Sequence, residues 1–297
     1  MTKLFNNMQA EAISKGKINV AVVNPVGKFS LGGAVLAAEI GLINPLLCGN
    51  KAEIEKVAKD NNLDLSKCEI IDAKSEEEIL AEAIKLCNNK TAQVLMKGKI
   101  HTSHFMSAVV KKDNQLRTNN LISHIFALDV PNYHKLLFVT DAAIHIAPTQ
   151  EHKEQIVVNA INFLHGLNIE RPKIALLSAV EEPSDKIIGS IDAYAVASKM
   201  RGNYNAIIEG PLAFDNAISK EASEIKDIKT ELAGDVDVLV SPNLESGNIL
   251  VKSLVYLAKA EVAGLVLGAS IPIILTSRAD NERARLLSVV LARLSIK

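Results

Sequence analysis

Tryptophan is absent from the 297-residue chain, and aromatic residues make up only 4% of it although 48% of the residues are hydrophobic. The interior must therefore be built largely from Val, Ile, Leu and Ala. Strands rich in these aliphatic residues are typical of parallel sheets that are buried on both faces. A chain of this length can bury a substantial core, and we expect two lobes of ordinary size.

Cysteine is also scarce. The three residues, Cys48, Cys68 and Cys87, are odd in number and widely separated, which matches neither a disulfide framework nor paired zinc ligands. We therefore expect the protein to reside in a reducing cytoplasm. Long apolar runs are lacking as well, so we expect no membrane span, and the first segment, MTKLFNNMQAEAISKG, indicates a short amphipathic helix rather than a secretory signal.

Neither sign of charge is in excess. Lys and Arg total 33 against 34 for Asp and Glu, which leaves a formal net charge of -1. Nucleic acid and anionic membranes are therefore not expected as partners, because both attract strongly basic surfaces. Any small anion must be bound by a few locally placed side chains.

Strand-like apolar runs recur along the chain and alternate with helical patterns. This alternation predicts an α/β sheet with right-handed crossovers. Several runs end in polar or glycine-containing clusters, and ligands of open α/β sheets bind beyond the carboxyl ends of the strands, so we expect a site there. The runs are INVAVV from Ile18, PLLCG from Pro45, AQVLMKG from Ala92, KLLFVTD from Lys135, KIALLS from Lys173, NAIIEG from Asn205, DVLVSP from Asp237 and IPIILTS from Ile271.

No linker rich in Pro, Gly or Ser marks a domain boundary in the sequence. We place one boundary where VPNYHK interrupts two apolar runs and a second where the chain crosses back before the last strand. The prediction is a first α/β lobe made of residues 1–129 and 268–297 and a second α/β lobe made of residues 130–267. An active-site cleft is expected between them.

The stretch NPVGKFSLGG, residues 24–33, has some features of a phosphate loop. It lacks the spacing of a Walker sequence and the GxGxxG of a dinucleotide fold, so nucleoside triphosphate binding is not expected. Gly32 and Gly33 are instead predicted to ease the start of the helix that follows.

The stretch MKGKIHTSHF places Lys97, Lys99 and Thr102 directly after a buried strand. Backbone amides at a helix start can receive an anion there, and the alternative is that both lysines are solvated turn residues. His101 and His104 have metal-ligand spacing, but no HExxH pattern or nearby cysteine completes a site, so we predict no metal.

Three other stretches offer charged side chains near strand ends. In LRTNNLISHIFALD, Arg117 suits a phosphate because its planar fork donates two parallel hydrogen bonds, although exposed structural arginines are equally common. In VTDAAIHIAPT, Asp141 is able to cap a helix, bind a metal or face a ligand. In EGPLAFDNAIS, a Gly-Pro turn at the strand end is expected to orient the side chains of Asp215 and Asn216 that follow it.

The stretch SPNLESGNILVKS sets Ser246, Gly247 and Asn248 directly before an apolar helical run that carries Lys252. Glycine lets the backbone approach a ligand closely, and free amides at a helix start favour negative charge. The stretch predicts a phosphate cradle, and an ordinary helix start is the alternative.

The stretch IPIILTSRADNERA ends an apolar run with a hydroxyl, a guanidinium and a carboxylate. Residues 271–276 are expected in the sheet, where they deliver Ser277 and Arg278 to its carboxyl edge with Asp280 one turn away. Together these three groups can bind a tetrahedral anion, donate to a developing oxyanion and accept a proton.

Taken in order, the motifs resemble the phosphate acyltransferase family, the phosphate acetyltransferases and phosphate butyryltransferases, with the butyryl branch the most similar. The resemblance implies reversible transfer of an acyl group between the sulfur of coenzyme A and inorganic phosphate, giving an acyl phosphate by direct attack and without a metal. The matching stretches are LMKG at Leu95, SHIFALDVP at Ser123, LFVTDAAI at Leu137, PKIALLSAVE at Pro172, EGPLAFDNAIS at Glu209, GNILVK at Gly247 and PIILTSRAD at Pro272.

The resemblance also implies roles for individual residues. Arg278 would grip the phosphate, and Ser277 would steady the tetrahedral transition state. Asp280 would be the general base, with Glu282 second, because Ala284 stands in the region where acetyl-transferring relatives carry an acid. The further residues predicted to bind substrate are Lys97, Thr102, Arg117, Asp141, Gly247, Asn248 and Lys252.

The family implies a three-layer α/β/α fold with two lobes, like that of the isocitrate and isopropylmalate dehydrogenases, and a homodimer. No cofactor would be bound permanently, because coenzyme A or acyl-CoA enters as a substrate together with phosphate. His145 stands where the butyryl branch often has a polar amide, and the acyl preference is left open.

Three alternatives to this activity remain. A metal- and NAD-dependent hydroxyacid dehydrogenase of the same fold would use Asp141, Asp215 and Asp280 to hold a divalent ion. A non-catalytic acyl-CoA-binding protein would keep the cleft without the chemistry. A covalent mechanism would use Cys48 as the nucleophile, although no histidine is visibly placed to activate it.

Overall fold

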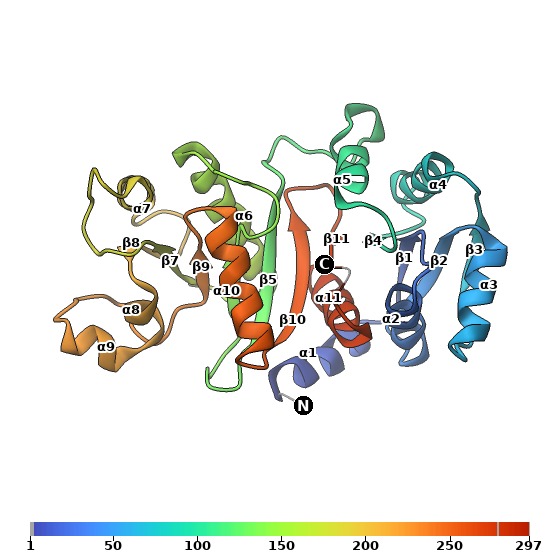
Figure 1. The fold of residues 1–297 in the computed structure, drawn as a ribbon, viewed down its shortest axis with the longest axis horizontal. Helices are drawn as coiled ribbons and strands as arrows, with labels where there is room; N and C mark the ends of the chain where they lie inside the picture. The colour runs from blue at the N-terminus through green and yellow to red at the C-terminus, as the bar shows by residue number, and fades with distance from the viewer. Residues whose placement is uncertain (1–2, 278, 297) are drawn as a thin grey trace. The chain divides into compact units, whose positions relative to one another are not determined.

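The computed structural model describes residues 3–277 and 279–296, in which strands and helices alternate along the chain (Figure 1). Its contacts form two compact units: unit 1 is Met1–Asn120 with Val262–Lys297, and unit 2 is Leu121–Glu261. The lobe boundaries expected near residues 129 and 267 stay predictions. Among the described helices, none combines the length and the apolarity that crossing a membrane requires.

The strands of unit 1 lie side by side in the order β3-β2-β1-β4-β11-β10. Neighbours from β3 to β11 run parallel, whereas β10 and β11 run antiparallel. The elements are α1 (Lys3–Ser14), β1 (Ile18–Val23), α2 (Lys28–Glu39), β2 (Ile43–Gly49), α3 (Lys51–Asp60), β3 (Glu69–Asp72), α4 (Glu76–Asn88), β4 (Val94–Lys97), α5 (Thr102–Val110), the short 3-10 helix η1 (Lys112–Asn114), β10 (Glu261–Leu267), β11 (Ile273–Ile274) and α11 (Glu282–Ser295).

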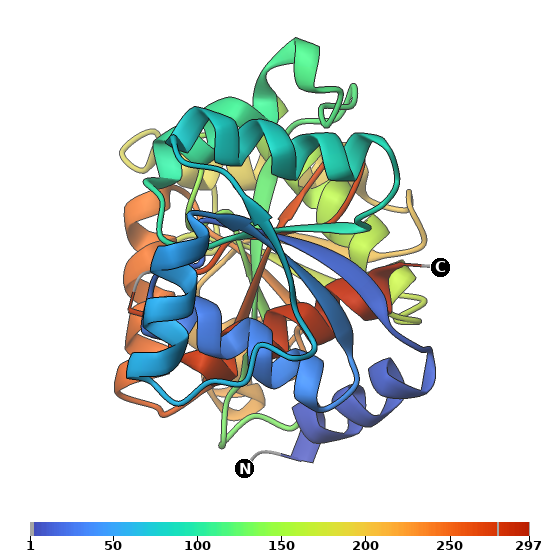
Figure 2. The ribbon, with the colours of Figure 1, turned by 90° about the vertical axis from the view of Figure 1, so that its right-hand side faces the viewer.

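Helices cover both faces of the sheet in unit 1 (Figure 2). On one face α2 packs against α11, which in turn packs against α1, and on the other face α4 packs against β1, β2 and β4. α11 is buried along most of its length, from Ala284 to Ala292. A helix buried all round belongs to the core, so the end of the chain completes the interior of this unit.

The strands of unit 2 lie in the order β5-β6-β9-β7-β8, with β5 antiparallel to β6 and the other neighbours parallel. α6 and α7 pack together on one face, and α10 contacts β5 and β6 from the other (Figure 1). The elements are β5 (Ser123–Asp129), β6 (Leu137–Thr140), α6 (Gln150–Gly166), β7 (Lys173–Leu177), α7 (Ile188–Met200), β8 (Ile207–Leu212), α8 (Phe214–Ile218), α9 (Lys220–Ile225), β9 (Val238–Val240) and α10 (Leu244–Tyr256).

The α/β class predicted from the alternation of strands and helices is confirmed. The sheet is mixed rather than purely parallel, because β5 and β10 enter it antiparallel to a neighbour. β11 is limited to Ile273–Ile274, shorter than the predicted strand over residues 271–276, although Leu275 and Thr276 are buried beyond it. The polar residues that follow are therefore carried by a short buried loop rather than directly by a strand end.

Two glycine motifs lie inside elements rather than between them. α2 begins at Lys28 with Gly27 as its N-cap, so Gly32 and Gly33 lie in the helix interior and do not ease its start as predicted. The Gly210-Pro211 pair lies within β8 rather than in a turn after it. Proline is tolerated there because β8 stands last in the strand order and needs no ladder bond on its outer side.

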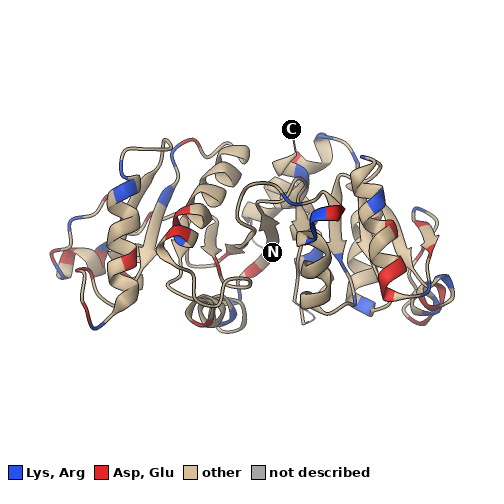
Figure 3. Ribbon diagram, turned by 90° about the horizontal axis from the view of Figure 1, so that it is seen from above, with Lys and Arg blue, Asp and Glu red and all other residues tan. Residues whose placement is uncertain are grey.

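A cluster of charges holds the amino ends of β6, β7 and β9 together. Asp235 Oδ1 lies 2.9 Å from His134 Nε2 and 2.8 Å from Lys135 Nζ, and its Oδ2 lies 2.7 Å from Lys173 Nζ. Hydrogen bonds from Lys135 first and Lys173 second hold the pKa of Asp235 well below its ordinary value. Elsewhere in both units Lys and Arg are interspersed with Asp and Glu (Figure 3).

Asp235→Asn is expected to lower the free energy of unfolding at pH 7 by about 1 kcal/mol. The loss is small because 44% of the Asp235 side chain is exposed, where solvent screens its ion pairs. Since the folded-state pKa is depressed, this stability is present above the unfolded pKa of about 3.9 and fades as the pH falls through the folded value. Urea unfolding at pH 7 and pH 3 measures the difference, and an equal effect of the substitution at both values would contradict it.

Candidate active site

The segment after β4 is joined tightly to the segment after β1. Gly98 N–H donates to the carbonyl oxygen of Val23 at 2.8 Å, and Lys99 N–H donates to that of Asn24 at 2.8 Å. The Asn24 side-chain amide returns a bond of 3.0 Å to the carbonyl oxygen of Lys99. The MKGK stretch is therefore held in one conformation by the backbone of its neighbour.

Lys97, predicted to bind substrate, ends β4 and is only 2% exposed. Its Nζ lies 3.5 Å from the carbonyl oxygen of Gly98. The solvated-turn alternative is therefore wrong for Lys97, whereas Lys99 is exposed as that alternative expects. Burying an ammonium group is costly, and charges kept at such a cost often mark functional sites.

Ser277 and Asp280, two of the three predicted catalytic residues, form one tight turn after β11. Ser277 N–H donates to Asp280 Oδ2 at 2.7 Å, and Asp280 N–H donates to the carbonyl oxygen of Ser277 at 3.2 Å. Both side chains are partly exposed. Arg278, the third, lies outside the described residues.

Arg285 connects this turn with the end of β4. Its Nη1 donates to the carbonyl oxygen of Lys97 and its Nη2 to that of Ser277, each at 3.2 Å. The predictions from sequence missed Arg285, although a signal was present. It stands beside the run LLSVVLA, which has no polar face of its own, and an arginine next to such a run is a candidate for burial.

The other predicted residues of unit 1 lie on its surface. Thr102 is exposed at the start of α5, where His101 is the N-cap residue and its side chain makes no capping hydrogen bond. Arg117 is exposed in a bridge to Ala269. His104 Nδ1 lies 2.6 Å from Glu76 Oε1, so its ring is paired with a helix carboxylate.

In unit 2, Asp141 stabilises a turn and does not cap a helix, because α6 begins only at Gln150 with Thr149 as its N-cap. The residue is 2% exposed. Its Oδ1 accepts hydrogen bonds from the N–H groups of Ala143 and Ile144 at 2.9 and 3.0 Å, and its Oδ2 accepts one from the N–H of His124 at 3.3 Å. The carboxylate thus shapes the TDAAI segment after β6.

α10 is anchored to this same TDAAI segment. Asn248 Nδ2 donates to the carbonyl oxygen of Ala142 at 3.2 Å, and a Cβ on Gly247 would lie 2.9 Å from Ala142 Cβ. The predicted helix start is corrected: α10 begins at Leu244, and Gly247 N–H already donates to the carbonyl oxygen of Asn243. Gly247 therefore permits close helix packing and offers no free amide to a phosphate.

Lys252 lies further along α10, two turns from the helix start. Its Nζ is 5.8 Å from the centroid of the Tyr256 ring, and the side chain is partly exposed. A cation over an aromatic face is weakly attracted to it, which orients the lysine without neutralising its charge.

The three carboxylates of the dehydrogenase alternative already have protein partners. Asp141 and Asp280 accept backbone N–H groups, and Asp215 Oδ2 lies 2.7 Å from Lys226 Nζ. The hydrogen bond from Lys226 lowers the pKa of Asp215. Over residues 3–277 and 279–296, no group of three or more His, Cys, Asp or Glu side chains is arranged to hold a metal ion.

The covalent alternative is opposed by the surroundings of Cys48. Its side chain is fully buried, and burial, followed by the nearby Cys87, raises the pKa of the thiol to about 12. A nucleophilic cysteine needs a lowered pKa and access to substrate. Cys48 has neither property.

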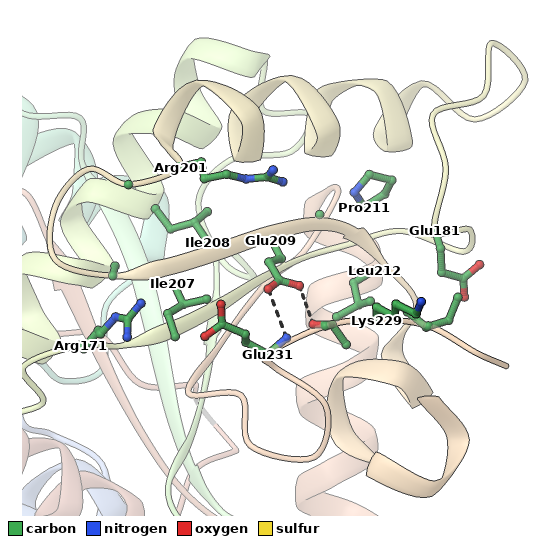
Figure 4. Close-up of a pocket in the computed structure, with 15 residues that line it drawn as sticks. Arg171, Glu181, Arg201, Ile207, Ile208, Glu209, Pro211, Leu212, Lys229 and Glu231 are labelled. Carbon is green, nitrogen blue, oxygen red and sulfur yellow. Dashed lines mark hydrogen bonds between the residues drawn. The ribbon is translucent and has the colours of Figure 1, made fainter. Parts of the chain in front are cut away.

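A cavity of about 560 Å³ lies along β8 in unit 2 (Figure 4). Glu209 in its wall accepts hydrogen bonds from Thr230 Oγ1 at 2.5 Å and from Glu231 N–H at 3.3 Å, so this carboxylate is held by the protein itself. The residues that line the cavity include none of those predicted from the sequence to bind substrate. Size alone therefore does not make this cavity the active site.

The structure thus brings the predicted residues together in two groups. In unit 1, Arg285 joins the backbone of Lys97 to that of Ser277, and Ser277 is bonded in turn to Asp280, so the turn that carries a hydroxyl and a carboxylate is tied to the end of β4. Such groups are able to bind an anion and move a proton. In unit 2, Asp141, Gly247 and Asn248 share the TDAAI segment.

Comparison of the sequence with known proteins points to one family. The profile of the family described as "Phosphate acetyl/butaryl transferase" matches residues 77–293. The chain is 47% identical over 294 residues to a phosphate acetyltransferase of Rickettsia typhi, covering 98% of this chain and 84% of the relative. It is 38% identical over 292 residues to a probable phosphate butyryltransferase of Bacillus subtilis, covering 98% and 97%. The acetyltransferase is thus the more similar, which corrects the expected order of the two branches.

Solved structures agree with the expected fold. A branched-chain phosphotransacylase from Enterococcus faecalis superposes with a TM-score of 0.83 at 30% identity, covering 94% of this chain and 99% of that chain. A 4-hydroxythreonine-4-phosphate dehydrogenase from Klebsiella pneumoniae shares the fold alone, with a TM-score of 0.57 at 12% identity over 94% and 99% of the chains. The prediction of a dehydrogenase-like α/β fold is confirmed.

Proposed function

Because the chain belongs to the phosphate acetyl/butyryl transferase family, we propose that it reversibly transfers a short acyl group between coenzyme A and inorganic phosphate to give an acyl phosphate. The observation that carries the proposal is the 47% identity to a phosphate acetyltransferase along 98% of the chain. Fold similarity adds little, because the same fold also occurs in a dehydrogenase.

The acyl group that we propose first is acetyl. The relative named as an acetyltransferase is 47% identical to this chain, against 38% for the relative named as a butyryltransferase. The two substrates differ by two methylene groups, and a hydrophobic pocket discriminates only about 10- to 200-fold for each methylene. Butyryl transfer at a lower rate is therefore the alternative.

In unit 1 we assign the reacting groups. Arg278 would hold the phosphate through a charge-assisted fork, and the hydroxyl of Ser277 would donate to the oxyanion that forms on the carbonyl carbon. Asp280 would take the proton of the coenzyme A thiol, because among the described residues its second oxygen accepts no hydrogen bond beside the one from Ser277 N–H to Oδ2. The buried Lys97 would add positive potential, and the exposed Arg117 and Thr102 would meet the phosphates of coenzyme A.

In unit 2 we assign a supporting group to the same reaction. Asn248 and Lys252 on α10 would contact substrate, whereas Asp141 and Gly247 would act by fixing the TDAAI segment against that helix. The family resemblance also leads us to propose a cytoplasmic homodimer, and the mass of the particle in solution tests its oligomeric part.

The proposed reaction needs no covalent enzyme intermediate. A phosphate oxygen attacks the thioester carbonyl carbon and gives its proton to Asp280, the tetrahedral intermediate collapses with cleavage of the carbon–sulfur bond, and the leaving thiolate takes that proton from Asp280. Holding the two substrates in line lowers the barrier because one complex replaces a collision of two solutes, an effect that reaches about 7–11 kcal/mol in the best cases. Placement of the reacting groups is therefore the main task of the protein.

The test is release of free thiol from acetyl-, butyryl- and isobutyryl-CoA at equal concentration, with and without phosphate. We expect release that depends on phosphate and is fastest with acetyl-CoA, by about tenfold or more over butyryl-CoA. Release without phosphate would indicate a thioesterase, and no release from any of the three would overturn the proposal. Faster turnover of butyryl-CoA would overturn only the acyl preference.

The same assay separates the two remaining alternatives. Activity that survives chelation of divalent ions by EDTA would exclude the metal-dependent dehydrogenase, whose chemistry also requires NAD. A non-catalytic acyl-CoA-binding protein would bind the thioester, as calorimetry detects, and release no thiol.

A further inference from the structure

Arg285 lies beneath the proposed reacting groups without reaching the surface. It sits in the first turn of α11, and its side chain is only 3% exposed. A substrate in solution cannot touch a guanidinium at that depth. Any effect of Arg285 on the reaction must therefore pass through the residues it contacts.

These contacts join two segments that are far apart in the sequence. One arm of the guanidinium, Nη1, bonds the carbonyl oxygen of Lys97 at the end of β4, and the other, Nη2, bonds that of Ser277 in the turn after β11. β4 and β11 are neighbours in the sheet, but the ladder between them pairs only Ile273 with Leu95 and Ile274 with Met96. Beyond that short ladder, on the side of the strand ends, Arg285 joins the two segments by one hydrogen bond to each.

We propose that Arg285 is a positioning residue for acyl transfer. By fixing the carbonyl groups of Lys97 and Ser277, it sets the positions of the reacting side chains in the turn after β11 relative to the end of β4. The inference rests on the proposed function. An arginine suits this task because its planar fork donates in two fixed directions at once, which a lysine cannot do. Asp280, bonded to Ser277 N–H in the same turn, is held by the same contact.

The packing of α2 against α11 is built to admit this side chain. A Cβ on Gly33 would lie 2.8 Å from Arg285 Cβ and 3.1 Å from its Cδ, and a Cβ on Gly32 would lie 2.8 Å from Glu282 Cδ. Two successive glycines in a helix interior lower its stability by about 0.5–1 kcal/mol each relative to alanine. Here they let α11 come close enough for Arg285 to run beneath the strand ends.

The burial of Arg285 is itself costly. Its Nε has no hydrogen-bond partner in the described part of the chain, and burial lowers the pKa of the guanidinium, although the nearby Asp280 acts in the opposite direction. Replacing a buried charge by an apolar side chain is often neutral for stability, so stability alone does not account for Arg285. Its two hydrogen bonds do account for it, because they hold the segment after β4 and the segment after β11 in fixed positions relative to each other.

The test compares Arg285→Met and Arg285→Lys with Arg293→Met. Arg293 is a matched control on the same helix, because it also bonds backbone carbonyls, those of Gly16 and Lys15, but two turns away from the proposed site. Turnover is measured as phosphate-dependent thiol release per folded protein, with KM for phosphate and acyl-CoA. Hydrogen exchange is measured in peptides covering residues 94–100 and 273–277.

We expect Arg285→Met to lower kcat about a hundredfold while KM for acyl-CoA changes less than about threefold, since a misplacement of about 1 Å costs that much in rate. The kcat of Arg285→Lys should lie between that of Arg285→Met and that of wild type. Arg293→Met should keep kcat within about threefold of wild type, even if its melting temperature falls as much as that of Arg285→Met. Both peptides should exchange faster in Arg285→Met than in Arg293→Met.

Several results would overturn the inference. One is a folded Arg285→Met with kcat within threefold of wild type, and another is equal losses in the Arg285 and Arg293 variants. If Arg285→Met does not fold, Arg285→Lys decides, and wild-type kcat and exchange in that variant would refute the role. If the wild-type chain releases no thiol, the proposed function fails, and unchanged exchange of both peptides in the variants would refute the positioning role separately.

Discussion

Arg278→Ala is expected to lower kcat/KM for the acyl transfer at least about a hundredfold, equivalent to about 2.7 kcal/mol of transition-state stabilisation. Arginine binds phosphate through two parallel charge-assisted hydrogen bonds, and alanine offers neither charge nor donor. The loss should appear in KM for phosphate as well as in kcat, because the guanidinium is proposed to hold the phosphate both before and during the attack. Initial rates at varied phosphate with saturating acetyl-CoA measure both parameters.

Arg283→Ala is the matched control for this prediction. It removes the same charge five residues further along, but Arg283 donates to Gln9 Oε1 and Asn6 Oδ1 at 3.0 Å and thereby joins α11 to α1. We expect its kcat to stay within about threefold of wild type. Arg278→Lys should fall between the two, because it keeps the charge and loses the fork. Loss of less than about tenfold in Arg278→Ala would contradict the assignment of the phosphate to this residue.

Gly98→Ala is expected to destabilise the protein by about 3 kcal/mol, the upper range for overpacking. A Cβ at this position would lie 2.6 Å from the carbonyl oxygen of Asn24 and closer still to that of Val23. Both atoms belong to the backbone, so no side chain can rotate away. The added methyl group must therefore push the segment after β4 off the segment after β1 and break the bonds between them.

Gly166→Ala is the control for Gly98→Ala, with the opposite sign. Gly166 ends α6, and a Cβ there would meet nothing within 4 Å. Alanine should raise stability by about 0.5 kcal/mol, because it restricts the unfolded chain and favours the helix. Chemical unfolding of the variants measures both changes. If the denaturant midpoint of Gly98→Ala equals that of wild type, the segment after β4 can shift at little cost, and the prediction is wrong.

Much of the fold was predictable because local pattern and final structure agree. The strand runs from Ile18, Ala92 and Lys173 contain β1, β4 and β7, since continuous aliphatic stretches are what buried strands require. The antiparallel entry of β5 and β10 was not predictable in this way. Strand direction depends on which neighbour a strand meets, and periodicity carries no information about that neighbour.

The candidate site shows the same limit at the level of single residues. Ser277 and Asp280 were predicted to lie together, and they do, because three residues of separation within a turn enforce it. The burial of Lys97 and the bond of Arg285 to its carbonyl oxygen depend on contacts across 188 positions of sequence. Gly247 was misplaced for a related reason: Asn243 caps α10 earlier than the Ser-Gly-Asn pattern suggests.

The discontinuity of unit 1 has a consequence for synthesis of the chain. Unit 2 is one continuous segment, Leu121–Glu261, whereas β11 and α11 come from the final residues. While the chain emerges from the ribosome, β4 therefore lacks its β11 neighbour and α2 lacks the helix that covers it. An open strand edge of this kind invites pairing with other chains. Nascent protein truncated before residue 262 should thus depend on chaperones far more than the finished chain.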